Sequence, residues 1–244
     1  MKIAILADIH GNLPALDAVL ADLAPRGIDL TVNLGDIVSG PLFPCETADR
    51  LMPLGLPTIR GNHERQLLTE APERMGPSDR FAAGALRADQ KHWLAGLPAT
   101  LRIGDDILMV HGTPASDLAY FLETVDAAGV RAASASEIEA RAADAPARLI
   151  LCGHTHTPRI VRTADGRLIV NPGSVGVPAY SDDEPFPHGV ETGAPHARYG
   201  IVEITPAGLA VDLRAVPYDW EAAAAAAEAN GRSDWARALR TGRV

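Results

Sequence analysis

Short apolar runs alternate with amphipathic stretches at the start of the chain. Apolar runs at residues 2–9, 30–37 and 58–61 predict buried strands, and residues 14–24 predict a helix with a proline at its first position. Strands that alternate with helices pair in parallel through right-handed crossovers. The opening of the chain therefore predicts an α/β fold.

After residue 100 the apolar runs come in pairs separated by turn sequences. The pairs are 101–103 with 107–110, 159–163 with 168–170, and 201–205 with 209–216. The Gly, Asp and Pro residues between the runs predict hairpins. Hairpins after a parallel opening predict two mixed sheets that face one another, with helices on the outside.

The remaining stretches predict helices and one loop. Residues 64–96 and 125–143 read as mainly helical, the alanine run 222–227 favours a helix, and the proline-rich acidic segment 178–195 predicts a loop. Neither a repeat nor a linker composition is present, so we expect one domain over residues 1–244. The two helical segments 64–96 and 125–143 are expected to form a substrate cap or a subunit contact; the oligomeric state is left open.

The composition is that of a globular protein, with 47% hydrophobic and 22% charged residues. The 22 Lys and Arg residues against 31 Asp and Glu residues give a net charge of −9, which disfavours a binder of nucleic acid or of an anionic membrane. No apolar stretch approaches the roughly 20 residues of a membrane-spanning helix. The N-terminus has no signal-peptide pattern, and the only cysteines are Cys45 and Cys152, so we expect a cytoplasmic protein with reduced thiols.

Polar motifs follow several of the predicted strands, and the ends of strands are where α/β proteins place their sites. On an extended segment, residues two apart point to the same side, so each Asp-x-His or His-x-His motif is expected to present a pair of ligands. The motifs are Asp8-Ile9-His10, Gly35-Asp36, Gly61-Asn62-His63-Glu64, His111-Gly112 and Gly153-His154-Thr155-His156.

Together the motifs offer seven oxygen or nitrogen ligands. A single catalytic zinc takes three protein ligands, whereas seven suit two metal ions that share one carboxylate at about 3.5–4 Å separation. Because no ligand is sulfur, Mn, Fe, Ni and Zn all suit the set. Each motif alone also occurs as a cap or a turn; their occurrence in order, each after a strand, indicates a dinuclear site.

This series of motifs resembles the calcineurin-like metallophosphoesterase superfamily, in its small prokaryotic phosphodiesterase branch. The resemblance runs from residue 1 to about residue 177 and includes Asn171-Pro172-Gly173-Ser174-Val175-Gly176. It implies a four-layer αββα sandwich of two mixed β-sheets flanked by helices, with two divalent or trivalent metal ions. The implied ligands are Asp8, His10 and His156 for one metal, Asn62, His111 and His154 for the other, with Asp36 as the bridge. His63 matches the catalytic histidine that helps the leaving oxygen depart.

The chain departs from the protein Ser/Thr phosphatases of that superfamily. Those continue Gly-Asp with a further Asp and Arg, whereas this chain reads Gly35-Asp36-Ile37-Val38-Ser39-Gly40. The acid that would orient His63 and the arginine that would bind phosphate are absent at those positions. Which residue orients His63 is therefore open, and a phosphoprotein phosphatase is disfavoured.

The function expected from these residues is hydrolysis of small soluble phosphate esters, such as nucleotides or dinucleoside polyphosphates. The hypothesis is in-line attack by a metal-bridging hydroxide, with His63 donating a proton to the leaving group. A nuclease is one alternative, which the acidic charge disfavours. A non-catalytic protein-binding scaffold of the same fold is another, although that class usually lacks a ligand or the catalytic histidine. Monoester against diester specificity and the identity of the metals are left open.

The roles of a few further residues are open. Arg60 either reaches the phosphate or pairs on the surface, and Tyr180 with Asp182 and Asp183 is expected to shape specificity. His188 and His196 either touch the substrate or lie exposed in the 178–195 segment and beside it.

Overall fold

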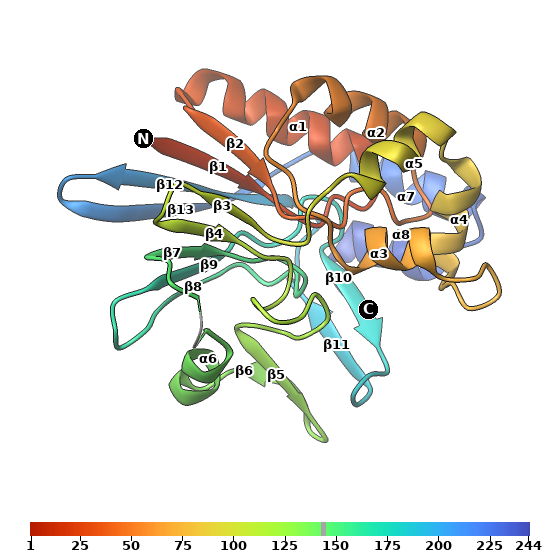
Figure 1. Ribbon diagram of the computed structural model, residues 1–244. Helices are drawn as coiled ribbons and strands as arrows, with labels where there is room; N and C mark the ends of the chain where they lie inside the picture. Colours follow the sequence, from red (N-terminus) through yellow and green to blue (C-terminus); the bar gives the residue numbers. More distant parts are fainter. Residues whose placement is uncertain (143–144) are drawn as a thin grey trace.

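Two mixed β-sheets pack face to face in the computed structural model, which describes residues 1–142 and 145–244 (Figure 1). The first sheet has the strand order β13-β12-β1-β2, and only its β1–β2 pair is parallel. The second has the order β3-β4-β7-β9-β8, with a parallel centre β4-β7-β9 and antiparallel edges. The strands are β1 Lys2–Leu6, β2 Leu30–Asn33, β3 Leu101–Ile103, β4 Ile107–Met109, β7 Leu149–Leu151, β8 Arg159–Arg162, β9 Leu168–Asn171, β12 Ala197–Thr205 and β13 Gly208–Val216.

The alternation of side chains along each strand produces the layers. On β1, Ile3 and Ile5 face the second sheet, while Ala4 and Leu6 face the helices α1 and α2. On the second sheet, Met109 belongs to the core between the sheets, and alternate side chains of β4 and β7 pack on α6. These helices are α1 Leu13–Leu23, α2 Pro44–Leu51 and α6 Ala135–Ala142. The order helix, sheet, sheet, helix confirms the predicted αββα sandwich.

The remaining helices lie at the end of the sandwich where the first-sheet strand β1 stops (Figure 1). The predicted helical stretch 64–96 is confirmed, and it consists of α3 Asn62–Thr69, α4 Pro77–Ala85 and α5 Ala88–Ala95. The alanine run lies in α7 Trp220–Ala229, which packs on α8 Ser233–Thr241. Among the described helices, none has both the length and the apolar character needed to cross a bilayer.

Three predicted strands are shorter than the apolar runs suggested. β1 ends at Leu6 instead of Ile9 and β2 at Asn33 instead of Ile37, while residues 58–61 contribute only a bridge between Thr58 and Asn33. The physical reason is a turn into the left-handed backbone region just after each of the two strands, which ends the sheet ladder.

Two segments differ in type from the prediction. Residues 125–143 are not mainly helical, because β5 (Glu123–Asp126) and β6 (Gly129–Ala132) form a hairpin before α6; residue 143 lies outside the described part. Gly129, with a φ of 109°, makes that turn possible. Residues 178–195 are not a loop but contain the hairpin of β10 (Ala179–Asp182) and β11 (His188–Glu191). Their prolines flank the two strands or lie in the turn, where no ladder bond is lost.

Candidate metal centre

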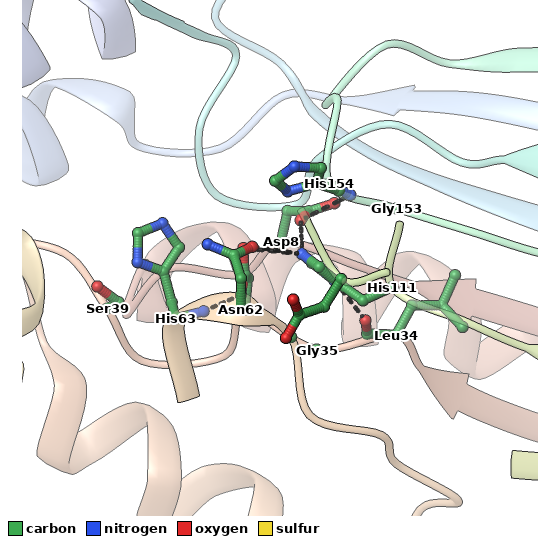
Figure 2. Close-up of polar contacts among 12 residues, drawn as sticks. Asp8, Leu34, Gly35, Ser39, Asn62, His63, His111, Gly153 and His154 are labelled. Carbon is green, nitrogen blue, oxygen red and sulfur yellow. Dashed lines mark hydrogen bonds and ion pairs between the residues drawn. The ribbon is translucent and has the colours of Figure 1, made fainter. Parts of the chain in front are cut away.

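The loops that follow β1, β2, β4 and β7 converge with the start of α3 at one end of the sandwich (Figure 2). Metal-ligating atoms there form two groups, each with its atoms within 4.8 Å of one another. The first group is Asp8, His10 and His156, and the second is Asp36, His111 and His154. The structure thus brings together residues up to 148 positions apart in the sequence, in the same grouping that the resemblance implies.

The His111 side chain has the shortest contacts within the second group and also approaches Asp8 of the first. Its Nε2 atom lies 3.0 Å from an Asp36 oxygen, 3.1 Å from Asn62 Oδ1 and 4.0 Å from Asp8 Oδ1. In the other group, Nε2 atoms of His10 and His156 are 3.1 Å apart. Asn62 therefore points its carbonyl oxygen into the second group, where it can serve as a further ligand.

The backbone of the site is not extended. Asp8, His10, Asp36, His154 and His156 all have a φ between 51° and 68°. Among the described residues these are the only non-glycine residues with positive φ, each a conformation that costs about 1–3 kcal/mol. The expectation that each pair shares one side of an extended segment is therefore wrong; successive left-handed turns aim the side chains at the centre.

Each of the four histidines in the two ligand groups forms a hydrogen bond from one ring nitrogen to a backbone carbonyl oxygen. A carbonyl only accepts, so that nitrogen carries the proton and the other nitrogen keeps its lone pair for a metal. The pairs are His10 Nδ1 with Ser39 at 2.7 Å, His111 Nδ1 with Leu34 at 2.8 Å, His156 Nδ1 with Val177 at 2.8 Å, and His154 Nε2 with Leu118 at 3.0 Å. The donor set and its orientation fit two metal ions.

Burial and neighbouring charges together determine the protonation of the candidate ligands. It lowers the pKa of His10 and of His154 to about 4 and that of His156 well below its usual value, which leaves these rings neutral. Burial also raises the pKa of Asp8 to about 8. For His111, burial is outweighed by the neighbouring Asp36 and Asp8 carboxylates, and its pKa rises to about 10. The space between the Asp8 and Asp36 side chains therefore favours a positive charge, such as that of a metal ion.

Glu64 holds the loop that carries Asp36. Its buried carboxylate accepts from the backbone N–H groups of Asp36 at 2.8 Å, Ile37 at 2.7 Å and Gly61 at 2.9 Å. A Cβ on Gly61 would lie 2.1 Å from an Asp36 carboxylate oxygen. Only glycine at residue 61 lets the two loops approach closely enough for these bonds.

Side chains at the end of β9 and just after it form hydrogen bonds to the first and last loops of the site. Ser174 donates its hydroxyl to the Asp8 carbonyl at 2.7 Å, and Asn171 donates to the Gly153 carbonyl at 2.8 Å. Both side chains are buried. These two residues of the Asn-Pro-Gly-Ser-Val-Gly segment support the backbone of Asp8 and of the His154 loop.

His63 has a carboxylate partner that sequence reasoning missed. Its Nδ1 lies 2.8 Å from Oδ1 of Asp79, and the Ser39 hydroxyl donates to the same oxygen at 2.5 Å. Asp79 lies in α4, 16 residues after His63, and is buried. Burial lowers the pKa of His63, but Asp36 and the Asp79 bond outweigh it and raise the pKa to about 9. The sequence carried no local signal for this partner, because Asp79 lies in the middle of the predicted helical stretch 64–96.

A cavity of about 860 Å³ opens above these groups. One wall comes from α3, α4 and α8 and includes Trp235; the other comes from the loop before β5 and from β10, and includes Tyr120, Tyr180 and Asp182. Arg60, whose guanidinium donates to the Leu97 carbonyl, is not part of the lining. Asp183 and His196 are not part of it either.

A comparison with protein-family models finds one match. The model of the calcineurin-like phosphoesterase superfamily domain matches residues 1–188. That range contains all seven candidate ligands together with His63 and Asp79, and it ends before β12, β13 and the helices α7 and α8.

Comparisons with individual proteins give similar results. An uncharacterized protein of Methanocaldococcus jannaschii, MJ0912, is 28% identical over 203 residues, which cover 72% of this chain and 76% of the relative. A solved metallophosphoesterase from Sphaerobacter thermophilus is 25% identical with a TM-score of 0.76, covering 99% of each chain. The hypothetical protein PH1004 from Pyrococcus horikoshii, 22% identical with a TM-score of 0.77, covers 99% of this chain and 98% of its own and shares the fold.

Proposed function

Because the chain belongs to the calcineurin-like phosphoesterase superfamily of metal-dependent hydrolases, we propose that it hydrolyses small soluble phosphate esters at a dinuclear metal centre. The observation that carries the proposal is the convergence of the two ligand groups with His63 in one cavity. In the proposed centre Asp8, His10 and His156 hold one metal, Asn62, His111 and His154 hold the other, and Asp36 bridges. When bound, the metals supply Lewis acidity that activates water and neutralises charge on the phosphoryl oxygens.

His63 is the proposed catalytic residue on the protein side. The Asp79 carboxylate favours the protonated form of the ring, whose proton can pass to the leaving oxygen. Asp79 accepts from Nδ1 at 2.8 Å, which leaves the Nε2 proton for transfer. Asp79, in α4, therefore takes the role of orienting His63 that belongs to an acidic residue this chain lacks after Gly35-Asp36.

The cavity indicates the size of the substrate. About 860 Å³ is within the range that small organic ligands and cofactors occupy, and it supports nucleotides or dinucleoside polyphosphates as candidates. The net charge of −9 weighs against the nuclease alternative. The scaffold alternative needs neither His63 nor its carboxylate partner, so their pairing favours an enzyme.

The test is hydrolysis of bis(p-nitrophenyl) phosphate and p-nitrophenyl phosphate by protein loaded in turn with Mn, Fe, Ni or Zn. We expect metal-dependent turnover in the wild type and its loss in His111→Ala, because His111 contacts both carboxylates. His92→Ala is the matched control, since His92 is exposed on α5 outside the cavity.

The two esters distinguish a phosphodiesterase from a phosphatase. Turnover of the diester leads to a nucleotide panel that begins with diadenosine polyphosphates, and turnover of the monoester alone indicates a phosphatase. Absence of turnover on both esters and on that panel, with two metal ions bound per chain, would favour the scaffold alternative.

A further inference from the structure

A chain of three hydrogen-bonded side chains lies in the cavity wall opposite α3 and α4. The hydroxyls of Tyr120 and Tyr180 are 2.7 Å apart, and the Tyr120 hydroxyl is 2.8 Å from Nε2 of His188. Both tyrosines are half-buried and line the cavity, whereas His188 is buried behind them on β11. Neither the ligand groups nor His63 accounts for this arrangement.

The direction of the hydrogen bonds follows from the far end of the chain. Nδ1 of His188 is 2.8 Å from the Phe186 carbonyl, which only accepts, so Nδ1 donates. In the neutral ring Nε2 then accepts from the Tyr120 hydroxyl. The Tyr120 oxygen in turn accepts from Tyr180. The Tyr180 hydroxyl is therefore the terminal donor of the chain.

The tyrosines lie directly beside the two metal-binding histidines that follow β7. The Tyr180 ring centre is 4.8 Å from that of His156, and the Tyr120 ring centre is 5.2 Å from that of His154. These two histidines belong to different ligand groups. The two tyrosine rings thus lie beside the proposed dinuclear centre, on the wall opposite the one that supplies His63, and the Tyr180 hydroxyl lies 3.5 Å from the His154 carbonyl.

Three arginines line the same cavity: Arg74 is exposed between α3 and α4, on the wall that carries His63, and the other two are hydrogen-bonded within the protein. Arg141 donates to the carbonyls of Phe121 and Glu123, and Arg232 donates to Asp234 and Ser78. The sequence also has no arginine in the position after Gly35-Asp36 where the Ser/Thr phosphatases bind phosphate.

We propose that the Tyr180 hydroxyl, the terminal donor of this chain, donates to a non-bridging phosphoryl oxygen of the substrate in exchange for its bond to Tyr120. This inference rests on the proposed function and names a binding residue of the same site. A charged phosphoryl oxygen is a stronger acceptor than the neutral Tyr120 oxygen, so rotation of the hydroxyl toward it is favourable.

The test measures binding of inorganic phosphate to metal-loaded protein by titration calorimetry, alongside ester turnover. Tyr180→Phe is expected to weaken phosphate binding about ten- to hundredfold, since it deletes one hydrogen bond to a charged group. Tyr120→Phe is expected to change binding much less than Tyr180→Phe, because it removes only the acceptor that Tyr180 gives up on binding phosphate. His188→Leu and His188→Gln should behave like Tyr120→Phe, since neither removes the Tyr180 proton.

Tyr199→Phe is the matched control, because the Tyr199 hydroxyl bonds to Asp22 and lies outside the cavity. Equal phosphate affinity in Tyr180→Phe and wild type, at equal metal content, would overturn the inference, as would absence of phosphate binding by the wild type. A wild type that binds phosphate through Tyr180 but turns over no ester would instead contradict the proposed function and leave this inference standing.

Discussion

Asp79 shows how much of the proposed chemistry depends on a single buried carboxylate. It binds His63 Nδ1 at 2.8 Å and is held by the Ser39 hydroxyl on the same oxygen. Its exposed fraction of 4% keeps the interaction in a medium of low dielectric constant, where a charge acts strongly. This contact orients His63 and, together with Asp36, favours the protonated form of its ring.

We predict that Asp79→Asn lowers kcat by about ten- to hundredfold while KM stays nearly unchanged. The variant keeps an acceptor of similar shape but loses the negative charge. The measurement is steady-state kinetics on phenyl and p-nitrophenyl esters, and the phenyl ester, whose leaving group needs a proton more, should be affected more.

A control variant and a double variant test this prediction further. Asp89→Asn, on the exposed surface of α5, should leave the kinetics as in the wild type. The double variant His63→Ala with Asp79→Asn should be no slower than His63→Ala alone, because Asp79 acts through His63. Additive losses would show that Asp79 acts on the substrate or on the fold instead.

At the scale of elements, Asp22 ties the end of α1 to the first sheet. Its carboxylate accepts from Arg26 at 2.6 Å, from the Tyr199 hydroxyl of β12 at 2.6 Å and from Arg214 of β13 at 3.2 Å. The hydrogen bond from Arg26 is the largest cause that lowers the pKa of Asp22 to about 2. The helix and both strands are thus joined through one anionic group.

This pKa predicts a pH-dependent contribution to stability. A carboxylate whose pKa falls from 3.8 to about 2 on folding stabilises the native state above pH 3.8, and the contribution disappears as the pH falls through 2. Asp22→Asn should lower the free energy of unfolding by about 1 kcal/mol at neutral pH, since the group is partly exposed. Thermal unfolding at a series of pH values checks this, and a difference between variant and wild type that is undiminished at pH 2 would refute it.

For the whole molecule, the metal centre and the fold are coupled. Asp8 and Asp36 are buried with almost no exposure just after the ends of β1 and β2. A metal ion that binds only the folded state stabilises it, by about 2.7 kcal/mol at a free concentration 100 times its Kd. The end of the sandwich that carries the site should therefore be least stable when metal is removed.

We predict that chelation with EDTA lowers the melting temperature by about 5–10 °C, from that free energy and the usual shift of about 2–4 °C per kcal/mol for a chain of this size. Re-addition of Mn should restore it. In His111→Ala the shift should be much smaller, and in His92→Ala it should match the wild type. Equal melting temperatures with and without EDTA in the wild type would contradict the prediction.

The outcomes for particular segments show where sequence reasoning succeeds. The hairpins at 101–109, 159–171 and 197–216 were predictable, because turn residues and apolar runs are local signals. The β5–β6 and β10–β11 hairpins were missed. Residues 178–195 carry prolines and charges that read as a loop, yet the strands between the prolines pair with each other. Pairing energy comes from a partner strand, which composition alone does not reveal.

The sequence by itself determined the alternation of strands and helices, the candidate ligand residues and their order along the chain. It could do so because each motif is only a few residues long and its chemistry lies in its side chains. Only the tertiary structure decided that Asp79 is the partner of His63, that five site residues take left-handed backbone turns, and that Tyr120, on the cavity wall, bonds to both Tyr180 and the buried His188. The physical reason is that these features arise from contacts between elements far apart in the chain, whose geometry is fixed when the two sheets and their loops pack together.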